Sequence, residues 1–265
     1  MPENIPIETL ELLESPPLPA PWPSGLLADI QGKVAADSGK VVVLDDDPTG
    51  TQTVYDIPVL THWSTVALAA ELQGPHAAFY ILTNSRSLTS DAAGRLNREI
   101  GLNLKAAVRQ VALPVEVVSR SDSTLRGHFP TEVEALAEAM EMGELPCLIV
   151  PCFFEGGRYT VNDIHYVAEG DQLVPAAQTP YADDAAFGYR HSNLCDWVAE
   201  KSAGRVHRDQ VVAISLVDLR RGGPDRVTDV LGALKPGSVC VVNAAEYSDL
   251  EVFVLGLLRA RAQGH

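Results

Sequence analysis

Short apolar runs rich in β-branched residues alternate with helix-like segments from Lys40 onward, and this alternation constrains the fold more than any other feature of the sequence. The runs are typical of β-strands: Val41–Leu44, Ile57–Leu60, Ala78–Thr83, Val115–Ser119, Leu148–Pro151, Val211–Leu216 and Val239–Asn243. Helical periodicity marks the segments between most of them: Thr65–Leu72, Thr89–Val111, Thr131–Met140, Asn193–Ser202, Pro224–Leu234 and Glu246–Arg261. Apolar strands that lack polar alternation are buried on both faces, as in parallel sheets covered by helices. The sequence therefore predicts an α/β fold: a three-layer, mostly parallel sheet flanked by helices.

Two parts of the chain depart from this alternation. Val161–Val167 and Gln172–Val174 flank a Glu-Gly-Asp turn, which predicts a small β-hairpin excursion. Seven of the 18 prolines lie within the first 23 residues, and proline fixes φ and removes a backbone donor. Residues 1–35 are therefore predicted to form a proline-rich extended arm, with a partly disordered tail as the alternative. Residues 36–265 are predicted to form the α/β domain.

Composition excludes several classes of function. The 265 residues carry 20 Lys and Arg against 35 Asp and Glu, a formal net charge of −15, which disfavours nucleic acid or an anionic membrane as partner. No apolar run approaches the roughly 18 residues that a membrane helix needs. The four cysteines form no Cys-x-x-Cys pair, so reduced thiols in a cytoplasmic protein are expected, and no metal site.

The first polar loop that follows a predicted strand is Asp45-Asp46-Asp47-Pro48-Thr49-Gly50. Ligands of open α/β sheets bind beyond the carboxyl ends of the strands, where this loop is expected to lie. Three adjacent carboxylates repel one another, so at least one should be held by hydrogen bonds, a cation or a substrate hydroxyl. A solvated turn is the alternative, because Asp-Pro-Thr-Gly is favourable turn chemistry by itself.

The second polar loop is Arg120-Ser121-Asp122-Ser123-Thr124-Leu125-Arg126-Gly127-His128. Hydroxyls, backbone amides near a helix start and forked guanidinium groups together suit a carboxylate or a phosphate. The alternative is an internal salt bridge from Arg120 or Arg126 to the aspartates at 45–47, and both accounts can hold together. The next segment, with Thr131-x-x-Glu134 after Pro130, is predicted to open a helix with a capping box.

Two further strands are also predicted to end in arginine-bearing loops, Asn84-Ser85-Arg86-Ser87 and Glu155-Gly156-Gly157-Arg158. The alternative for each loop is a surface arginine near a helix terminus. The histidines, His165 among them, lack metal-ligand spacing, and surface or capping roles are expected for them. The sequence contains neither a Walker A loop nor a Gly-x-Ser-x-Gly elbow, which argues against those nucleotide-binding and hydrolase classes.

These motifs resemble the N-terminal half of the four-carbon acid sugar kinase family. The resemblance rests on Asp46–Gly50, Asn84–Ser87, Arg120–His128 and the later Thr179–Ser192, which occur in the family's order. It implies phosphorylation of erythronate, threonate, 3-oxo-tetronate or hydroxythreonate with ATP. Three positions depart from the family pattern: Pro48 replaces an aromatic residue, Arg120 replaces a residue that is often lysine, and His128 replaces an asparagine.

The resemblance also implies roles for individual residues. Asp46 and Asp47 would be catalytic, orienting hydroxyls and accepting a proton, with Asp122 as the second candidate base. The expected substrate-binding residues are Arg86, Arg120, Asp122, Ser123, Thr124, Arg126 and Gly127. Arg86 and Arg126 would hold the carboxylate of the sugar acid.

The expected partners are a small anionic sugar acid and an ATP-binding domain. In the family that domain follows at about His265, so it would lie in the same chain or in a partner chain. ATP and magnesium are implied by the resemblance but are not expected to be bound by this chain alone. The alternative is a stand-alone, non-catalytic domain that binds or senses a small molecule.

Overall fold

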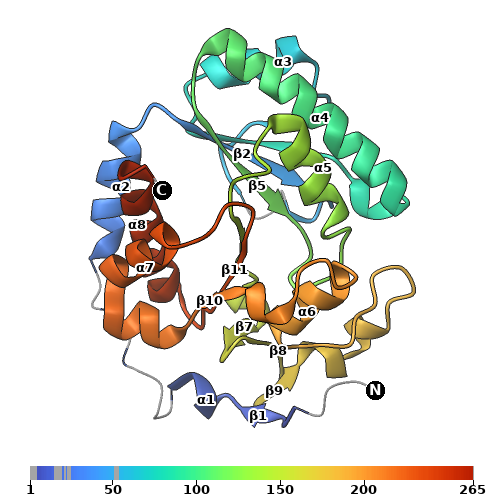
Figure 1. Cartoon of the computed structure of the whole chain (residues 1–265), viewed down its shortest axis with the longest axis vertical. Coiled ribbons are helices and arrows are strands. Elements are labelled where there is room, and N and C mark those ends of the chain that lie inside the picture. Colours follow the sequence, from blue (N-terminus) through green and yellow to red (C-terminus); the bar gives the residue numbers. More distant parts are fainter. Residues whose placement is uncertain (1–4, 15–19, 21, 23–24, 51–53, 265) are drawn as a thin grey trace. The chain divides into compact units, whose positions relative to one another are not determined.

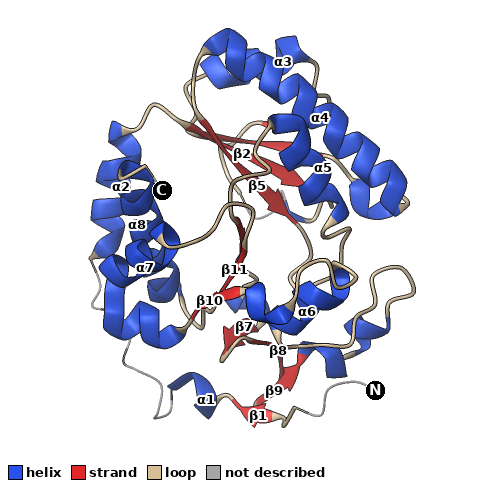
Figure 2. Ribbon diagram, viewed as in Figure 1, coloured by secondary structure: helices blue, strands red, loops and turns tan. Residues whose placement is uncertain are grey.

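The computed structural model describes residues 5–14, 20, 22, 25–50 and 54–264 (Figures 1 and 2). The chain divides into two compact units. Unit A consists of Asp37–Asp122 and Gly127–Glu144, and unit B consists of Met1–Ala36, Ser123–Arg126 and Leu145–His265. None of the described helices is long and apolar enough to cross a membrane.

Unit A is built on a parallel sheet with the strand order β3-β4-β2-β5. The strands are β2 (Lys40–Asp45), β3 (Val59–Leu60), β4 (Ala78–Leu82) and β5 (Val115–Arg120). In the register of the sheet Asp45 lies opposite Leu82 on one side and Arg120 on the other. The last residues of three strands therefore meet at one edge of the sheet, from which the polar loops emerge.

Three helices of unit A pack on this sheet: α3 (Thr65–Gln73), α4 (Ser90–Val111) and α5 (Thr131–Met140). Alternate residues of the two central strands point to one face, because side chains alternate along a strand. Those residues form a core with apolar side chains of all three helices: Val42, Leu44, Phe79, Ile81, Leu68, Ile100, Leu104 and Leu136. This core fixes the strand ends that carry the polar loops.

Unit B contains a second parallel sheet with the order β10-β11-β6. Its strands are β6 (Cys147–Ile149), β10 (Val212–Ile214) and β11 (Val239–Val242). The helices of this unit are α1 (Glu11–Glu14), α2 (Leu26–Ala36), α6 (Leu194–Lys201), α7 (Gly223–Gly232) and α8 (Tyr247–Ala262). Parallel sheets flanked by helices confirm the predicted α/β class, although the parallel strands divide between two sheets.

The predicted hairpin is confirmed within an antiparallel sheet of unit B, ordered β1-β9-β8-β7. Its strands are β1 (Glu8–Thr9), β7 (Arg158–Val161), β8 (Ile164–Glu169) and β9 (Gln172–Pro175). Gly170 closes the β8–β9 turn with φ +65°, a conformation that glycine adopts without steric cost.

The N-terminal segment carries more regular structure than an extended arm implies. Most of its proline cluster, Ser15–Pro23, lies outside the described residues, while β1 and α2 fall within residues 1–35 or directly continue them. Trp22 is described, and it packs against the core of unit B beside Gly223, where a Cβ would collide with the indole ring.

The predicted capping box at the start of α5 is wrong. Pro130 occupies the N-cap position and Thr131 is already helical, so no side chain caps the first turn. The Thr131 hydroxyl instead accepts a hydrogen bond from Ser90 Oγ of α4 at 3.1 Å. A local sequence motif does not show that a side chain of a neighbouring helix can form a hydrogen bond with the hydroxyl.

Candidate functional site

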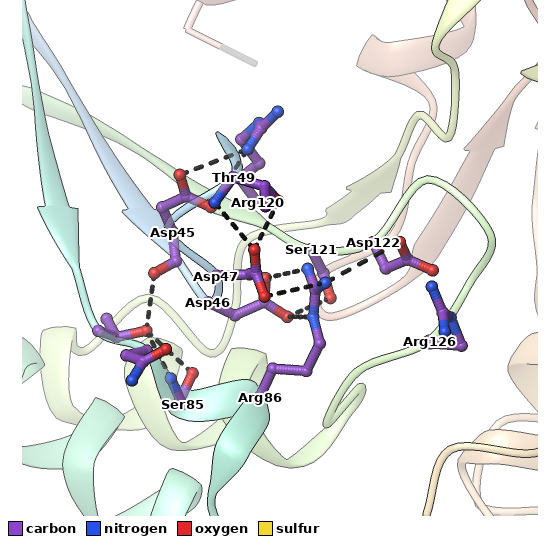
Figure 3. Close-up of polar contacts among 12 residues, drawn as sticks. Asp45, Asp46, Asp47, Thr49, Ser85, Arg86, Arg120, Ser121, Asp122 and Arg126 are labelled. Atoms are coloured by element: carbon purple, nitrogen blue, oxygen red, sulfur yellow. Dashed lines mark hydrogen bonds and ion pairs between the residues drawn. The ribbon is translucent and has the colours of Figure 1, made fainter. Parts of the chain in front are cut away.

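The polar loops of unit A bring four carboxylates and two guanidinium groups together beyond the carboxyl ends of β2, β4 and β5 (Figure 3). We call this group the acidic cluster; it consists of Asp45, Asp46, Asp47, Asp122, Arg86 and Arg120. The end of β2 and the loop after it supply the three consecutive aspartates, and β5 supplies Arg120 and, two residues further, Asp122. Arg86 lies on the short 3₁₀ segment η2 (Ser85–Ser87) after β4.

Arg86 forms a bidentate ion pair with Asp46. Its Nη2 donates to Asp46 Oδ1 at 2.6 Å and its Nε donates to Oδ2 at 3.1 Å. Ser121 Oγ also donates to Asp46 Oδ2, at 2.7 Å, and the Asp46 side chain is only 4% exposed. Both carboxylate oxygens of Asp46 are therefore occupied, which suits a positioning role more than proton transfer.

Two more carboxylates lie near the same guanidinium. Arg86 Nη1 is 3.5 Å from Asp47 Oδ2 and 4.0 Å from Asp122 Oδ1. Burial alone would lower the pKa of Arg86, but the hydrogen bonds and charge of Asp46 outweigh it, and the pKa is raised. Arg86 is thus held as a cation by the protein's own carboxylates.

Arg120 is paired in the same way. Its Nη1 lies 3.2 Å and 3.3 Å from the two oxygens of Asp45, whose side chain is 1% exposed. Burial raises the pKa of Asp45, and the charge of Arg120 opposes this shift. The internal salt bridge considered from the sequence is confirmed for Arg120.

Asp47 is the most accessible carboxylate of the acidic cluster, with a side chain that is 28% exposed. Its Oδ1 accepts hydrogen bonds from the Thr49 backbone N–H at 2.9 Å and from Thr49 Oγ1 at 2.5 Å. These bonds lower the pKa of Asp47, so the group is ionised at neutral pH. Its Oδ2 has only the more distant Arg86 among the ion pairs of the described residues. Asp47 therefore presents the most accessible carboxylate of the acidic cluster.

Glycines in both motifs leave room for these ion pairs. A Cβ on Gly50 would collide with Arg120 and Asp45, and a Cβ on Gly127 would collide with Ser121 Oγ. Gly127 also has φ +150°, which non-glycine residues rarely adopt. The two motif glycines are thus required by close side-chain packing around the acidic cluster.

We expect Gly127→Ala to destabilise the protein by about 1–3 kcal/mol, because it strains the backbone and displaces Ser121 from Asp46. Urea denaturation measures this change. Gly143→Ala is the matched control in the same unit, because no atom lies within 4 Å of its added Cβ. Equal stability of the two variants would contradict this account of the Arg-Gly pair.

Another buried carboxyl lies near the acidic cluster. Glu132 on α5 is 5% exposed and accepts a hydrogen bond from Asn97 Nδ2 at 3.0 Å. Burial raises its pKa and the charge of Asp46 adds to this shift, whereas hydrogen bonds from Ser85 and Asn97 oppose it. Glu132 is therefore more easily protonated in the folded chain than in the unfolded chain.

The raised pKa predicts a pH-dependent effect of Glu132→Gln. Between the unfolded and the folded pKa, the native state binds more protons than the unfolded state, so the wild type loses stability as the pH rises. Glutamine does not ionise, so the stability of the variant relative to the wild type should rise as the pH is raised from 4.5 to 7. Urea denaturation at both pH values tests this, with Glu134→Gln on the same helix as control. A stability difference that does not change with pH would refute it.

The segment Ser123–Arg126 packs in unit B. His165 Nε2 donates to the Ser123 carbonyl at 2.8 Å, and the Tyr189 hydroxyl donates to the Thr124 carbonyl at 2.7 Å. Leu125, between them and Arg126, is buried with φ +66°, a strained conformation for leucine. Side chains from distant parts of unit B therefore hold this segment in shape.

The surface or capping role expected for the histidines is wrong for His165. Its side chain is fully buried, and its Nδ1 lies 3.0 Å from Thr160 Oγ1. The position of His165 within the predicted hairpin strand was the only feature of the sequence that could have indicated its burial. The sequence spacing of residues does not show what a strand packs against.

Arg126 lies over the ring of Tyr181, with its Cζ 5.1 Å from the ring centroid. Its Nη1 is 3.9 Å from Asp184 Oδ2, and its Nε donates to Thr124 Oγ1 at 3.1 Å. The side chain of Arg126 is 29% exposed. Of the predicted site residues, Asp46, Asp47, Arg86, Arg120, Asp122 and Gly127 therefore lie in unit A, and Ser123, Thr124 and Arg126 lie in unit B.

In the part of the chain that the structure describes, no group of three or more His, Cys, Asp and Glu side chains is placed to hold a metal ion. The cysteines are free thiols, and burial raises the pKa of Cys152 and of Cys195 to about 11. These thiols are protonated at neutral pH and fit a packing role.

Comparison with known proteins assigns a family to this geometry. Residues 41–265 match the sugar-binding N-terminal domain family. The chain belongs to this family. A D-erythronate kinase from Heliobacterium modesticaldum is 26% identical over 225 residues, which cover 82% of this chain and 47% of the kinase. The sugar-binding domain of this chain thus spans about half the length of that curated relative.

Solved structures share the fold of this sugar-binding domain. A Haemophilus influenzae protein superposes with a TM-score of 0.58 at 19% identity, covering 84% of this chain and 56% of that protein. A domain of unknown function from Bordetella bronchiseptica, solved as a domain-swapped dimer with bound citrate, gives a TM-score of 0.59 at 19% identity. That comparison covers 86% of this chain and 58% of the Bordetella chain.

Proposed function

We propose that this chain is the substrate-binding domain of a cytoplasmic, ATP-dependent kinase for four-carbon sugar acids. The candidate substrates are erythronate, threonate, 3-oxo-tetronate and hydroxythreonate. The observation that carries the proposal is the acidic cluster, assembled from the signature loops of a sugar-binding family at the sheet edge where α/β proteins bind ligands. The likeness to a D-erythronate kinase supports the substrate class. The citrate held by the Bordetella relative agrees with a preference for small hydroxy acids.

Phosphoryl transfer needs little covalent chemistry from a protein beyond positioning, charge compensation and a base near the attacking hydroxyl. Asp47 supplies that base, because it is ionised and accessible and one of its oxygens is held by Thr49. Asp46 positions Arg86 and Ser121. Asp122, with a side chain that is 13% exposed, is the second candidate base.

The acidic cluster has more carboxylates than guanidinium groups, so it suits the hydroxyls of a sugar acid better than its carboxylate. Arg86 and Arg120 are engaged by aspartates, which leaves them less charge to offer a substrate. The guanidinium of Arg126, in unit B, has the charge that a carboxylate needs, and Ser123 and Thr124 of the same unit and Gly127 of unit A remain predicted hydrogen-bonding residues. Of the two arginines predicted to hold the carboxylate, Arg86 is engaged by Asp46, so Arg126 is the proposed carboxylate partner.

ATP is the second substrate of the proposed reaction and carries magnesium on its phosphates. We propose that the nucleotide binds on a separate ATP-binding domain, in the same chain or in a partner chain.

A thermal-shift panel of four-carbon acids tests the proposal. The cognate acid at 100 times its dissociation constant adds about 2.7 kcal/mol to the free energy of unfolding. Glycerol at the same concentration is the control for unspecific stabilisation by a polyol. The absence of a melting shift with every erythronate, threonate and hydroxythreonate isomer at millimolar concentration would refute the proposed substrate class.

A further inference from the structure

Arg158 and Tyr181 of unit B form a feature that the proposed roles leave unused. Arg158 is the first residue of β7, and Tyr181 lies on the short 3₁₀ segment η5 (Pro180–Asp183). The Cζ of Arg158 is 5.6 Å from the centroid of the Tyr181 ring, and the Cζ of Arg126 is 5.1 Å from the same centroid. Two guanidinium groups therefore lie over one aromatic ring, which is a favourable partner for weakly hydrated cations.

The Arg158 side chain is partly buried without a counterion. Its Nη2 donates to the Tyr181 hydroxyl at 3.3 Å and its Nη1 donates to the Gly156 carbonyl. Its Nε is buried and lacks a hydrogen-bond partner within the described part of the chain, and no carboxylate there forms an ion pair with Arg158. A buried, unpaired donor on a charged group is unfavourable and calls for an explanation.

Two positively charged side chains lie close to the Tyr181 ring. Arg126 Nη1 is 3.9 Å from Asp184 Oδ2, whereas Arg158 forms no ion pair with a carboxylate of the described residues. Two like charges near one ring repel each other, and an anion that both can reach offsets this repulsion. In the acidic cluster, by contrast, Arg86 and Arg120 each form an ion pair with an aspartate.

The backbone holds Arg158 in place before any ligand arrives. Its N–H donates to the Phe153 carbonyl at 2.9 Å, and its carbonyl accepts from the Phe153 N–H at 3.1 Å, so the turn 153–158 is closed. Gly157 has φ +71°, and a Cβ there would collide with Ala168 of β8. Because the backbone of Arg158 is already fixed, less conformational entropy is lost when the side chain binds a ligand. Such preorganisation is typical of a ligand-binding residue.

We propose that Arg158, Arg126 and the Tyr181 hydroxyl form an oxyanion site in unit B that binds the carboxylate of a sugar acid. This inference rests on the proposed function for the identity of the acid. A carboxylate between two guanidinium groups forms charge-assisted hydrogen bonds, which are the strong ones in proteins. A phosphate group has the same chemistry, and the experiment separates these two sources.

Isothermal titration of three probes tests the site: D-erythronate, erythritol and inorganic phosphate. Erythritol carries hydroxyls but no carboxylate, so it reports on hydroxyl recognition alone. Arg158→Ala should raise the dissociation constant of D-erythronate at least tenfold and leave that of erythritol unchanged. Arg158→Lys should restore little, because an ammonium does not reproduce the guanidinium fork. Exposed Arg190→Ala in the same unit is the matched control and should bind like the wild type.

The outcomes separate this site from the proposed function. Unchanged erythronate affinity in a folded Arg158→Ala protein overturns the site, and so does an equal loss of erythronate and erythritol, which indicates a structural role. If the wild type binds no erythronate, the proposed substrate is wrong. The titration with inorganic phosphate then tests the oxyanion site. Phosphate binding that Arg158→Ala weakens tenfold supports an oxyanion site for a phosphate group, and the absence of phosphate binding as well overturns it.

Discussion

Replacing Asp249 with alanine is expected to lower the free energy of unfolding by about 3–5 kcal/mol, the size measured when one partner of a buried ion pair is removed. Asp249 on α8 accepts hydrogen bonds from Arg220 Nε at 2.7 Å and Nη2 at 2.9 Å. It also accepts the backbone N–H groups of Ala245 and Glu246, at 2.9 Å and 3.1 Å. The side chains of Arg220 and Asp249 are 3% and 0% exposed, so the alanine variant removes the closer carboxylate from a buried cation, whose ion pair with Glu246 is longer at 3.6 Å.

Urea denaturation of the Asp249→Ala protein measures this effect. The matched control is Asp225→Ala, because Asp225 forms an ion pair with Arg259 but its side chain is 89% exposed. Exposed pairs contribute at most about 1 kcal/mol. A loss of similar size in both variants would show that the Arg220–Asp249 pair does not hold α8 on unit B.

Arg126→Ala is expected to weaken D-erythronate binding by about 10- to 150-fold, corresponding to about 1.5–3 kcal/mol for hydrogen bonds to a charged group. Stability should change less than binding, because the Arg126 side chain is 29% exposed. Titration calorimetry and thermal melting of the same variant measure both quantities. Arg126→Lys should remain weak, since lysine lacks the planar fork.

The opposite pattern would identify Arg126 as a structural residue. In that case the melting temperature of Arg126→Ala falls by several degrees while the folded protein binds erythronate as tightly as the wild type. The Asp184 contact and the Tyr181 ring would then account for the fixed shape of the segment, and the carboxylate would need another partner.

The secondary structure was largely predictable from the sequence because it follows local patterns. The helix predicted at Thr131–Met140 coincides with α5, and the run Val41–Leu44 lies within β2. The pairing of strands was not predictable, because alternation says which segments are buried but not which neighbours they choose. The division of the parallel strands between two sheets is therefore visible only in the structure.

The same holds for the candidate site: its loops follow from the local sequence, but the contacts between them depend on the tertiary structure. The loops that carry charge could be identified, since each follows an apolar strand. The partners of Arg86 and Arg120 depend on the order β4-β2-β5, which places Asp45 and Asp46 between the two arginines. His165 was missed for the same reason, because its partner Ser123 lies 42 residues away along the chain.

The central claim is that this domain binds a four-carbon sugar acid, and titration of D-erythronate into the purified protein tests it most directly. Asp47→Ala, which removes the accessible carboxylate of the acidic cluster, is titrated beside the wild type. The account predicts saturable binding to one site per chain in the wild type and weaker binding in a folded Asp47→Ala protein. The absence of saturable binding of erythronate or threonate to the folded wild type would contradict it.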